Sequence, residues 1–271
     1  DQHINEDSAD SLSMEGLVID GEQALSQMQF TVISNSDAGN LGAEFSRSML
    51  HLTALTEDYF SLSPIVLTLT VNDGEYSVET TMNVYIDPVN DEPILIDIGN
   101  QETDEDTPLV LTLEATDVDE DVLTYSAASE QPNNVSVNIT DNQLTLTPDL
   151  NWNGIVNISV SVSDGDLEDS EIFTLTVNPV NDTPTIDLPE SFSFEEDGGL
   201  VEDFSGFVDD IDGDDLVLTV SDTLNVTVTI DGFNVTFGSV LDFNGTETLT
   251  FTVNDNQGRA IASDDIDIIV T

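Results

Sequence analysis

Leu67-Thr68-Leu69-Thr70-Val71-Asn72-Asp73-Gly74 holds the pattern that decides the fold. Apolar and small polar residues alternate up to Val71, which is the period of a half-buried β-strand, and the Asn-Asp-Gly that follows is typical of a tight turn. The same pattern of alternation and turn ends at Asp164 and again at Asp255. Because these two aspartates and Asp73 are spaced 91 residues apart, the chain repeats itself.

A second motif marks the boundaries between the repeats. Val89-Asn90-Asp91-Glu92-Pro93 returns 91 residues later as Val180-Asn181-Asp182-Thr183-Pro184. The period predicts an all-β chain of three domains, at residues 1–91, 92–182 and 183–271, of which the first is divergent. About seven alternating runs in each period are typical of an antiparallel β-sandwich. Since prolines flank both short linkers, we expect the sandwiches to be arranged end to end.

The charge of the chain excludes several classes of function. Among 271 residues there are 56 aspartates and glutamates, two arginines and no lysine, which gives a formal net charge of −54. Nucleic acids and anionic membrane surfaces are bound through lysine and arginine, so we expect neither as a partner. No run of 18 apolar residues is present, which argues against insertion into a membrane. The chain has no cysteine, so thiolate metal sites are excluded as well.

The acidic residues gather at fixed places in each repeat. In the second repeat, Asp117-Val118-Asp119 precedes a strand and Asp164-Gly165-Asp166 forms a turn. Carboxylates about 4 Å apart near a surface repel each other by roughly 4 kcal/mol, and too few cations are present to balance them. Calcium prefers six to eight oxygen ligands and is the ion best suited to such groups. Aspartate is also an ordinary turn residue, so most of the other acids are interpreted as solvated surface.

These stretches resemble the cadherin-like and Ig-like tandem modules of large bacterial surface proteins, including adhesins. The resemblance covers the second repeat nearly throughout, fits the third well and is weaker in the first. The matching segments are Asp104–Pro108 (DEDTP), Ala115–Tyr125 (ATDVDEDVLTY), Leu146–Gly154 (LTPDLNWNG), Val162–Gly165 (VSDG) and Pro179–Pro184 (PVNDTP).

In cadherins calcium lies between successive domains, and the resemblance implies a set of ligands at each junction. At the second junction the implied ligands are Glu105, Asp149, Asn151, Asn181, Asp182, Asp210, Asp212 and Asp255. At the first junction they are Glu6, Asp58, Asn90, Asp91, Asp117, Asp119 and Asp164. In this comparison Asp58 stands in the place of Asp149, and Phe60 stands in the place of Asn151. Pro88 and Pro179 replace a linker acid of cadherins, so we expect fewer ions at each junction.

Catalysis has little support in the sequence. The two histidines are His3, near a terminus, and His51, which is interpreted as a strand residue. Trp152 invites a sugar-binding interpretation, but Phe243 holds the same place in the third repeat, and such a recurring aromatic is more often packed into a core. The sequence therefore predicts a protein that is not an enzyme.

The function that the sequence favours is a calcium-rigidified spacer or stalk of an extracellular, cell-surface protein. Its partners are calcium ions and the neighbouring modules of the same chain. Two alternatives stay open: an adhesion module that itself binds a glycan or a surface protein, and a subunit of an extracellular filament.

Overall fold

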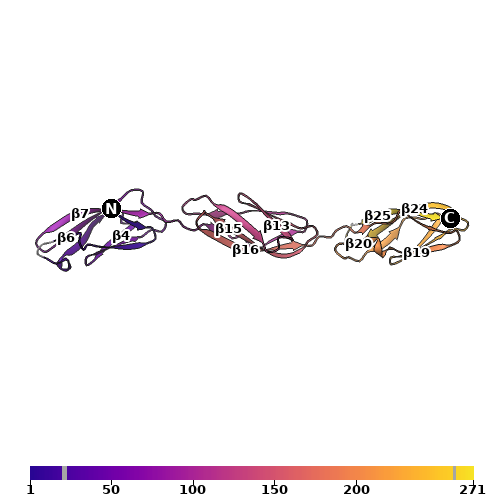
Figure 1. Ribbon diagram of the computed structural model, residues 1–271, viewed down its shortest axis with the longest axis horizontal. Coiled ribbons are helices and arrows are strands. Elements are labelled where there is room, and N and C mark those ends of the chain that lie inside the picture. The colour runs from indigo at the N-terminus through magenta and orange to yellow at the C-terminus, as the bar shows by residue number, and fades with distance from the viewer. Residues whose placement is uncertain (20–22, 259–260) are drawn as a thin grey trace. The chain divides into compact units, whose positions relative to one another are not determined.

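The computed structural model describes residues 1–19, 23–258 and 261–271. Strands, turns and two short 3-10 helices make up this part of the chain, with no α-helix in it (Figure 1). The chain divides into two compact units, one of residues 1–97, 113–126 and 160–171, the other of residues 98–112, 127–159 and 172–271. This division passes through the second repeat, so each unit contains one of the two Val-Asn-Asp linkers.

The first unit contains a sandwich of two sheets, with strand orders β1-β7-β6-β3 and β2-β5-β4, and a short ladder of β8 with β11. Its elements are β1 (Gln2–Asn5), β2 (Ala9–Ser13), η1 (Leu25–Gln27), β3 (Gln29–Asn35), β4 (Leu41–Ser46), β5 (Met49–Ala54), β6 (Ile65–Asn72), β7 (Ser77–Asp87), β8 (Ile94–Leu95) and β11 (Ala115–Thr116). Buried residues of both sheets, such as Leu50, Leu52, Leu67 and Val84, form one core. The segment around Met49 to Ala54 is a strand, although its sequence also allows a helical turn.

The second unit contains three-stranded sheets of order β10-β14-β13 and β19-β23-β22, a four-stranded sheet of order β18-β25-β24-β21, and a β17-β20 ladder. Its elements are β9 (Gln101–Asp104), β10 (Leu109–Thr112), β13 (Val135–Thr140), β14 (Gln143–Pro148), β17 (Thr185–Ile186), β18 (Ser191–Phe194), β19 (Gly199–Asp203), η2 (Phe204–Gly206), β20 (Val208–Asp209), β21 (Val217–Val220), β22 (Val226–Asp231), β23 (Asn234–Ser239), β24 (Gly245–Asn254) and β25 (Ile261–Val270). The remaining strands, β12 (Thr124–Ser129), β15 (Gly154–Ser163) and β16 (Glu168–Asn178), begin in one unit and end in the other, and form a sheet of order β12-β15-β16-β9.

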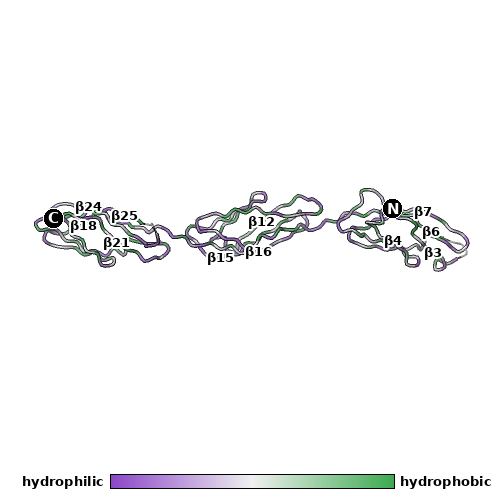
Figure 2. Tube along the Cα trace, turned by 180° about the vertical axis from the view of Figure 1, so that it is seen from behind, coloured by the Kyte–Doolittle hydropathy of each residue, from purple (hydrophilic) through white to green (hydrophobic). Residues whose placement is uncertain are grey.

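Alternation along the strands places the core. In β24 the residues Leu249, Phe251 and Val253 are buried while the threonines between them are half-buried. Figure 2 shows hydrophobic and hydrophilic residues interspersed along the chain. At about 25 cal/mol per Å² of apolar surface removed from water, such buried rows supply the main stabilisation of each sandwich. The predicted all-β sandwich architecture is confirmed.

The sequence predicted antiparallel sheets. Most of the described strand pairs are antiparallel, but each repeat also contains a parallel pair. A strand near the start of each repeat pairs in parallel with the last strand of that repeat: β1 with β7, β9 with β16, and β18 with β25. The early strand begins at the end of the sandwich where the chain enters the repeat. The last strand finishes at the opposite end, where the chain leaves the repeat. Two such strands run in the same direction when they lie side by side, and a repeat of 91 residues gives no sign of this pairing.

The recurring aromatic residues Trp152 and Phe243 each pack against the glycine two positions later, where the next strand begins. A Cβ added to Gly154 would lie 3.0 Å from the Trp152 ring, and one added to Gly245 would lie 3.2 Å from the Phe243 ring. Both glycines have a positive φ, of 149° and 155°. Phe243 also packs against the core of the third repeat, as the sequence predicted for this position.

Candidate metal centres at the two linkers

The first centre is built from turns that bring acids to the linker Val89-Asn90-Asp91. Glu6 and Asp7 follow β1, Asp58 follows β5, and the Asp117–Asp121 turn follows β11. Asp7 and Asp58 have φ values of 54° and 55°, in the left-handed region that aspartate tolerates better than most residues. The turn chemistry of aspartate therefore serves both the chain reversal and the gathering of carboxylates.

Three hydrogen bonds join consecutive linker residues to this set of acids. The Val89 N–H donates to Glu6 Oε1 at 2.7 Å, and the Asp91 N–H donates to Asp119 Oδ2 at 2.8 Å. The side-chain amide of Asn90 donates to Asp164 Oδ2 at 2.8 Å. Glu6 and Asp119 thus order the linker with one oxygen and retain a second oxygen for another partner, whereas Asp164 Oδ1 already accepts from the N–H groups of Asp166 and Leu167.

The acids of the first centre lie close enough together to repel one another when they are ionised. Oxygens within 4.8 Å of one another are offered by Glu6, Asp91 and Asp119, by Asp7, Asp58 and Asp91, and by Asp117, Asp119 and Asp121. Glu6 is only 4% exposed, and its Oε2 is a buried atom with no hydrogen-bond partner among the described residues. Asp91 Oδ2 and Asp117 Oδ2 are also buried and have no hydrogen-bond partner among the described residues. Buried oxygens that face only other carboxylates fit a hard divalent cation such as calcium.

The carboxyl groups of Asp91 and Glu6 in the first centre have raised pKa values. Burial and then the Asp58, Asp119, Asp7 and Asp117 carboxylates raise the pKa of Asp91 above its ordinary value. Burial and nearby carboxylates, with Asp119 first among them, also raise the pKa of Glu6, although the Val89 N–H acts against them. Crowding of like charges therefore opposes the ionised forms that a metal ion would stabilise.

The second centre repeats this arrangement at the linker Val180-Asn181-Asp182. The Val180 N–H donates to Glu105 Oε1, and the Asp182 N–H donates to Asp212 Oδ2 at 2.7 Å. The Asn181 side-chain amide donates to Asp255 Oδ2 at 2.9 Å. Glu105 and Asp255 are 3% and 2% exposed, so two carboxylates are buried at this linker.

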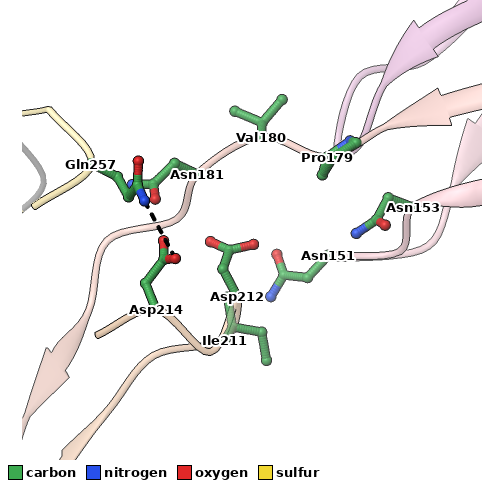
Figure 3. Close-up of a pocket in the computed structure, with 9 residues that line it drawn as sticks. All are labelled: Asn151, Asn153, Pro179, Val180, Asn181, Ile211, Asp212, Asp214 and Gln257. Carbon is green, nitrogen blue, oxygen red and sulfur yellow. Dashed lines mark hydrogen bonds between the residues drawn. The ribbon is translucent and has the colours of Figure 1, made fainter. Parts of the chain in front are cut away.

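Among the described residues, oxygens converge at the second centre in one group of three acids, compared with three such groups at the first. Asp210, Asp212 and Asp214 offer oxygens within 4.8 Å of one another, and the buried Asp210 Oδ2 has no partner among the residues described. The side-chain amide of Asn151 lies between Asp106 and Asp182, with one of its terminal atoms 3.2 Å from an oxygen of each. Figure 3 shows Asn151 and Asp212 directed toward the same space, beside the linker residues Pro179 to Asn181. Burial and then Asp212, Asp106, Glu105 and Asp210 raise the pKa of Asp182.

The structure brings together nearly all the residues that the resemblance implied. Glu6, Asp58, Asn90, Asp91, Asp117, Asp119 and Asp164 belong to the first centre, and Glu105, Asn151, Asn181, Asp182, Asp210, Asp212 and Asp255 belong to the second. Asp149 is exposed and contributes backbone hydrogen bonds to its turn, and no contact among the described residues joins its side chain to the second centre. The ligand roles of all these residues stay predictions.

One correspondence between the repeats was wrong. Asp58 and Asn151 are the residues with positive φ in their turns, at 55° and 54°, so Asp58 corresponds to Asn151 and not to Asp149. Ile65 follows Asp58 by seven positions, whereas Val156 follows Asn151 by five, so the first repeat is two residues longer here. A fixed period of 91 residues misaligns the turn for that reason.

Four acids of these centres were not predicted as ligands. Asp7 and Asp106 follow the predicted glutamates directly, and Asp121 and Asp214 extend the predicted Asp-x-Asp pairs by two positions. Their recurrence in the sequence could have identified them. Asp7 and Asp106 hold equivalent positions beside predicted ligands, as do Asp121 and Asp214.

Two family models match consecutive parts of the chain. Residues 89–178 match the family model described as a cadherin-like domain, and residues 181–270 match the one described as a bacterial Ig domain. The chain carries these two domains in tandem. Domains of both families are typically structural rather than enzymatic, and together they point to a surface or extracellular protein.

Solved structures confirm the fold. Mouse cadherin-23 EC22-24 is 20% identical, with a TM-score of 0.55, over 93% of this chain and 89% of that chain. Human CDH23 EC21-23 is 16% identical, also with a TM-score of 0.55, over 90% of this chain and 89% of that chain. A comparison with curated proteins finds no match. Within the described ranges, no helix is long and apolar enough to cross a membrane.

The two histidines, His3 and His51, lie on strands β1 and β5 of the first repeat. His51 lies on β5, as the sequence predicted, and its Nδ1 is 2.7 Å from Ser11 Oγ on the neighbouring strand. His3 on β1 stacks on Tyr85 with ring centroids 4.8 Å apart, and its Nδ1 lies 2.9 Å from Asp87 Oδ2.

Proposed function

We propose that the chain is a spacer or stalk segment of an extracellular adhesin-type protein, and that calcium ions at the two linkers rigidify it. The observation that carries the proposal is the repeated convergence of carboxylates on each Val-Asn-Asp linker, with the buried oxygens of Glu6 and Asp210 left without a hydrogen-bond partner in the described part of the chain. A solvated acidic surface does not require acids to be buried beside a linker.

The chain's own residues supply two parts of this function. Glu6 and Glu105 each accept a hydrogen bond from the first residue of a linker, and Asp119 and Asp212 accept one from its third residue. These bonds position the linker before any ion is bound. A bound calcium ion would supply the positive charge that lets the remaining carboxylate oxygens stay ionised and close together.

The test is a calcium titration of the whole chain, followed by small-angle scattering and by thermal melting. We expect calcium to narrow the distribution of particle dimensions and to raise the melting temperature, and a chelator to reverse both effects. Magnesium at the same concentration is the control, because it demands near-octahedral geometry and releases its water reluctantly. Scattering curves that do not change between chelator and millimolar calcium would contradict the proposal.

A second candidate function is direct binding of a partner by the first repeat. Leu17, Ile19, Tyr76 and Val78 line a groove there and are 66%, 89%, 74% and 66% exposed. Exposed aliphatic and aromatic side chains around one groove are more typical of an adhesive surface than of a plain spacer. The substitution Tyr76→Ser would weaken adhesion in this case without altering the response to calcium.

A further inference from the structure

The two centres are built alike but differ at two positions. Asp7, Asp91, Asp117, Asp119, Asp121 and Asp164 in the first centre correspond to Asp106, Asp182, Asp210, Asp212, Asp214 and Asp255 in the second. Glu6 corresponds in the same way to Glu105. The differences lie at the turn that follows β5 or β14 and at the second oxygen of the buried glutamate.

The first difference is one of charge. Asp58 belongs to a group of three carboxylates with Asp7 and Asp91, whereas Asn151 stands between Asp106 and Asp182 in the second centre. An aspartate offers two charged oxygens to a cation, and an asparagine offers one neutral oxygen. At this turn the first centre therefore has a carboxylate where the second has a neutral amide, and calcium affinity rises with the number of charged ligands.

The second difference concerns which oxygens are already engaged. Glu105 Oε2 accepts a hydrogen bond from the Asn153 side-chain amide at 3.3 Å. The corresponding atom, Glu6 Oε2, is buried and has no partner in the part of the chain that the structure describes. An ion that uses this oxygen displaces a hydrogen bond at the second centre and displaces none at the first.

From these two differences we propose that the first centre binds calcium more tightly than the second, so that the junctions load in order as calcium rises. The inference rests on the proposed function, because it assumes that both centres bind calcium. Between the two affinities, the first linker is ordered while the second remains a hinge. The main cause of the affinity difference is the charge of Asp58, which the neutral Asn151 lacks. The hydrogen bond from Asn153 to Glu105 increases the difference, because an ion at the second centre must displace it.

Site-specific labels can follow the two linkers separately. The chain has no cysteine, so Glu92→Cys and Thr183→Cys each create a single attachment site for a nitroxide label. Glu92 and Thr183 are both exposed and hold the same place in their linkers, so the two labelled linkers share the sequence Val-Asn-Asp-Cys-Pro. The mobility of each label is measured by electron paramagnetic resonance against free calcium from about 0.1 µM to about 10 mM, which includes the affinities of sensor and extracellular sites.

We expect the Glu92→Cys label to be immobilised at a free calcium concentration at least about tenfold lower than the Thr183→Cys label. The reciprocal substitutions test the cause. Asp58→Asn should raise the first midpoint by about tenfold, and Asn151→Asp should lower the second by a similar factor. Because Asn151→Asp adds a ligand and leaves the first centre untouched, this arm remains informative if Asp58→Asn fails to fold.

The outcomes separate the inference from the proposed function. Equal midpoints for the two labels, or a lower midpoint at the second linker, would overturn the inference while calcium binding stands. Midpoints that stay in place after Asn151→Asp would also overturn it. If neither label responds to calcium in a chain with its native circular dichroism spectrum, the proposed function fails first and the inference fails with it.

Discussion

Replacing Asp91 with asparagine should stabilise the first sandwich in the presence of a chelator and reduce the additional stability that calcium confers. Asp91 belongs to two groups of three acids, one with Glu6 and Asp119 and one with Asp7 and Asp58. It is the residue at which these groups meet, and its Oδ2 is buried without a hydrogen-bond partner among the described atoms. The variant keeps the backbone N–H that donates to Asp119 at 2.8 Å.

The magnitude follows from the separations. Two unit charges 4.8 Å apart repel each other by about 3.5 kcal/mol at an effective dielectric constant of 20. Asp91 has such a neighbour in both Glu6 and Asp119, but solvent screening at partly exposed acids reduces the sum to about 1–2 kcal/mol. In a chelator, Asp91→Asn should therefore raise the melting temperature by about 5–15 °C, since 1 kcal/mol corresponds to about 4–8 °C in a domain of this size.

The response to calcium should shrink in the same variant. A site at free calcium 100 times its Kd stabilises the folded state by about 2.7 kcal/mol, and a tenfold weaker site at the same concentration contributes about 1.4 kcal/mol. Calorimetric melting of parent and variant, each in chelator and in calcium, gives both quantities. The control is Glu92→Gln, which removes an exposed carboxylate from the adjacent linker position. A variant that melts below the parent in chelator and keeps the full calcium increment would show that Asp91 is not a ligand.

Three further predictions concern other parts of the chain. Asp182→Ala should lower the calcium-dependent melting midpoint and broaden the scattering-derived dimensions, while circular dichroism shows that the sandwiches remain folded. Millimolar calcium should raise the melting temperature more than an additional 100 mM NaCl does, because salt with a Debye length of about 8 Å acts weakly between acids only a few ångströms apart; equal effects would favour simple screening. Burial opposes the charge of Glu247, but hydrogen bonds from the N–H groups of Leu224, Asn225 and Val226 outweigh it and lower its pKa. Its contribution is present above the unfolded pKa and lost as pH falls through the folded one, so Glu247→Gln should destabilise by about 1–3 kcal/mol at neutral pH and by less in acid.

The sequence predicts the strands and the linkers well because both depend on local patterns. Leu67 to Val71 alternates because one face of β6 is buried, and Val89-Asn90-Asp91 recurs because each of its residues makes a specific hydrogen bond. The position of Asp164 could likewise be predicted, since its turn hydrogen bonds from the N–H groups of Asp166 and Leu167 are local.

Features that depend on distant parts of the chain could not be predicted in this way. The parallel pairing of β1 with β7 joins residues about 80 positions apart and leaves no mark in either strand. The equivalence of Asp58 and Asn151 depends on backbone conformation, because both residues adopt a positive φ while the loops that follow them differ in length. Whether an acid is buried, as Glu6 is, also depends on the packing of several turns.

The acids of this chain therefore fall into two populations with different physical demands. Most of the 56 are exposed or half-buried on strands and turns, where water and dissolved salt reduce their repulsion and the high net charge keeps the chain soluble. Two acids of each centre accept hydrogen bonds from backbone N–H groups of the linker, so these acids cannot move apart without releasing the linker; they are Glu6 and Asp119 in the first centre, and Glu105 and Asp212 in the second. Repulsion within a centre is then a force on the linker itself, and whatever neutralises that repulsion also fixes the linker. In the proposed function, a side chain such as Glu6 would couple the two events, because its Oε1 accepts from the linker N–H while its Oε2 is left for the ion.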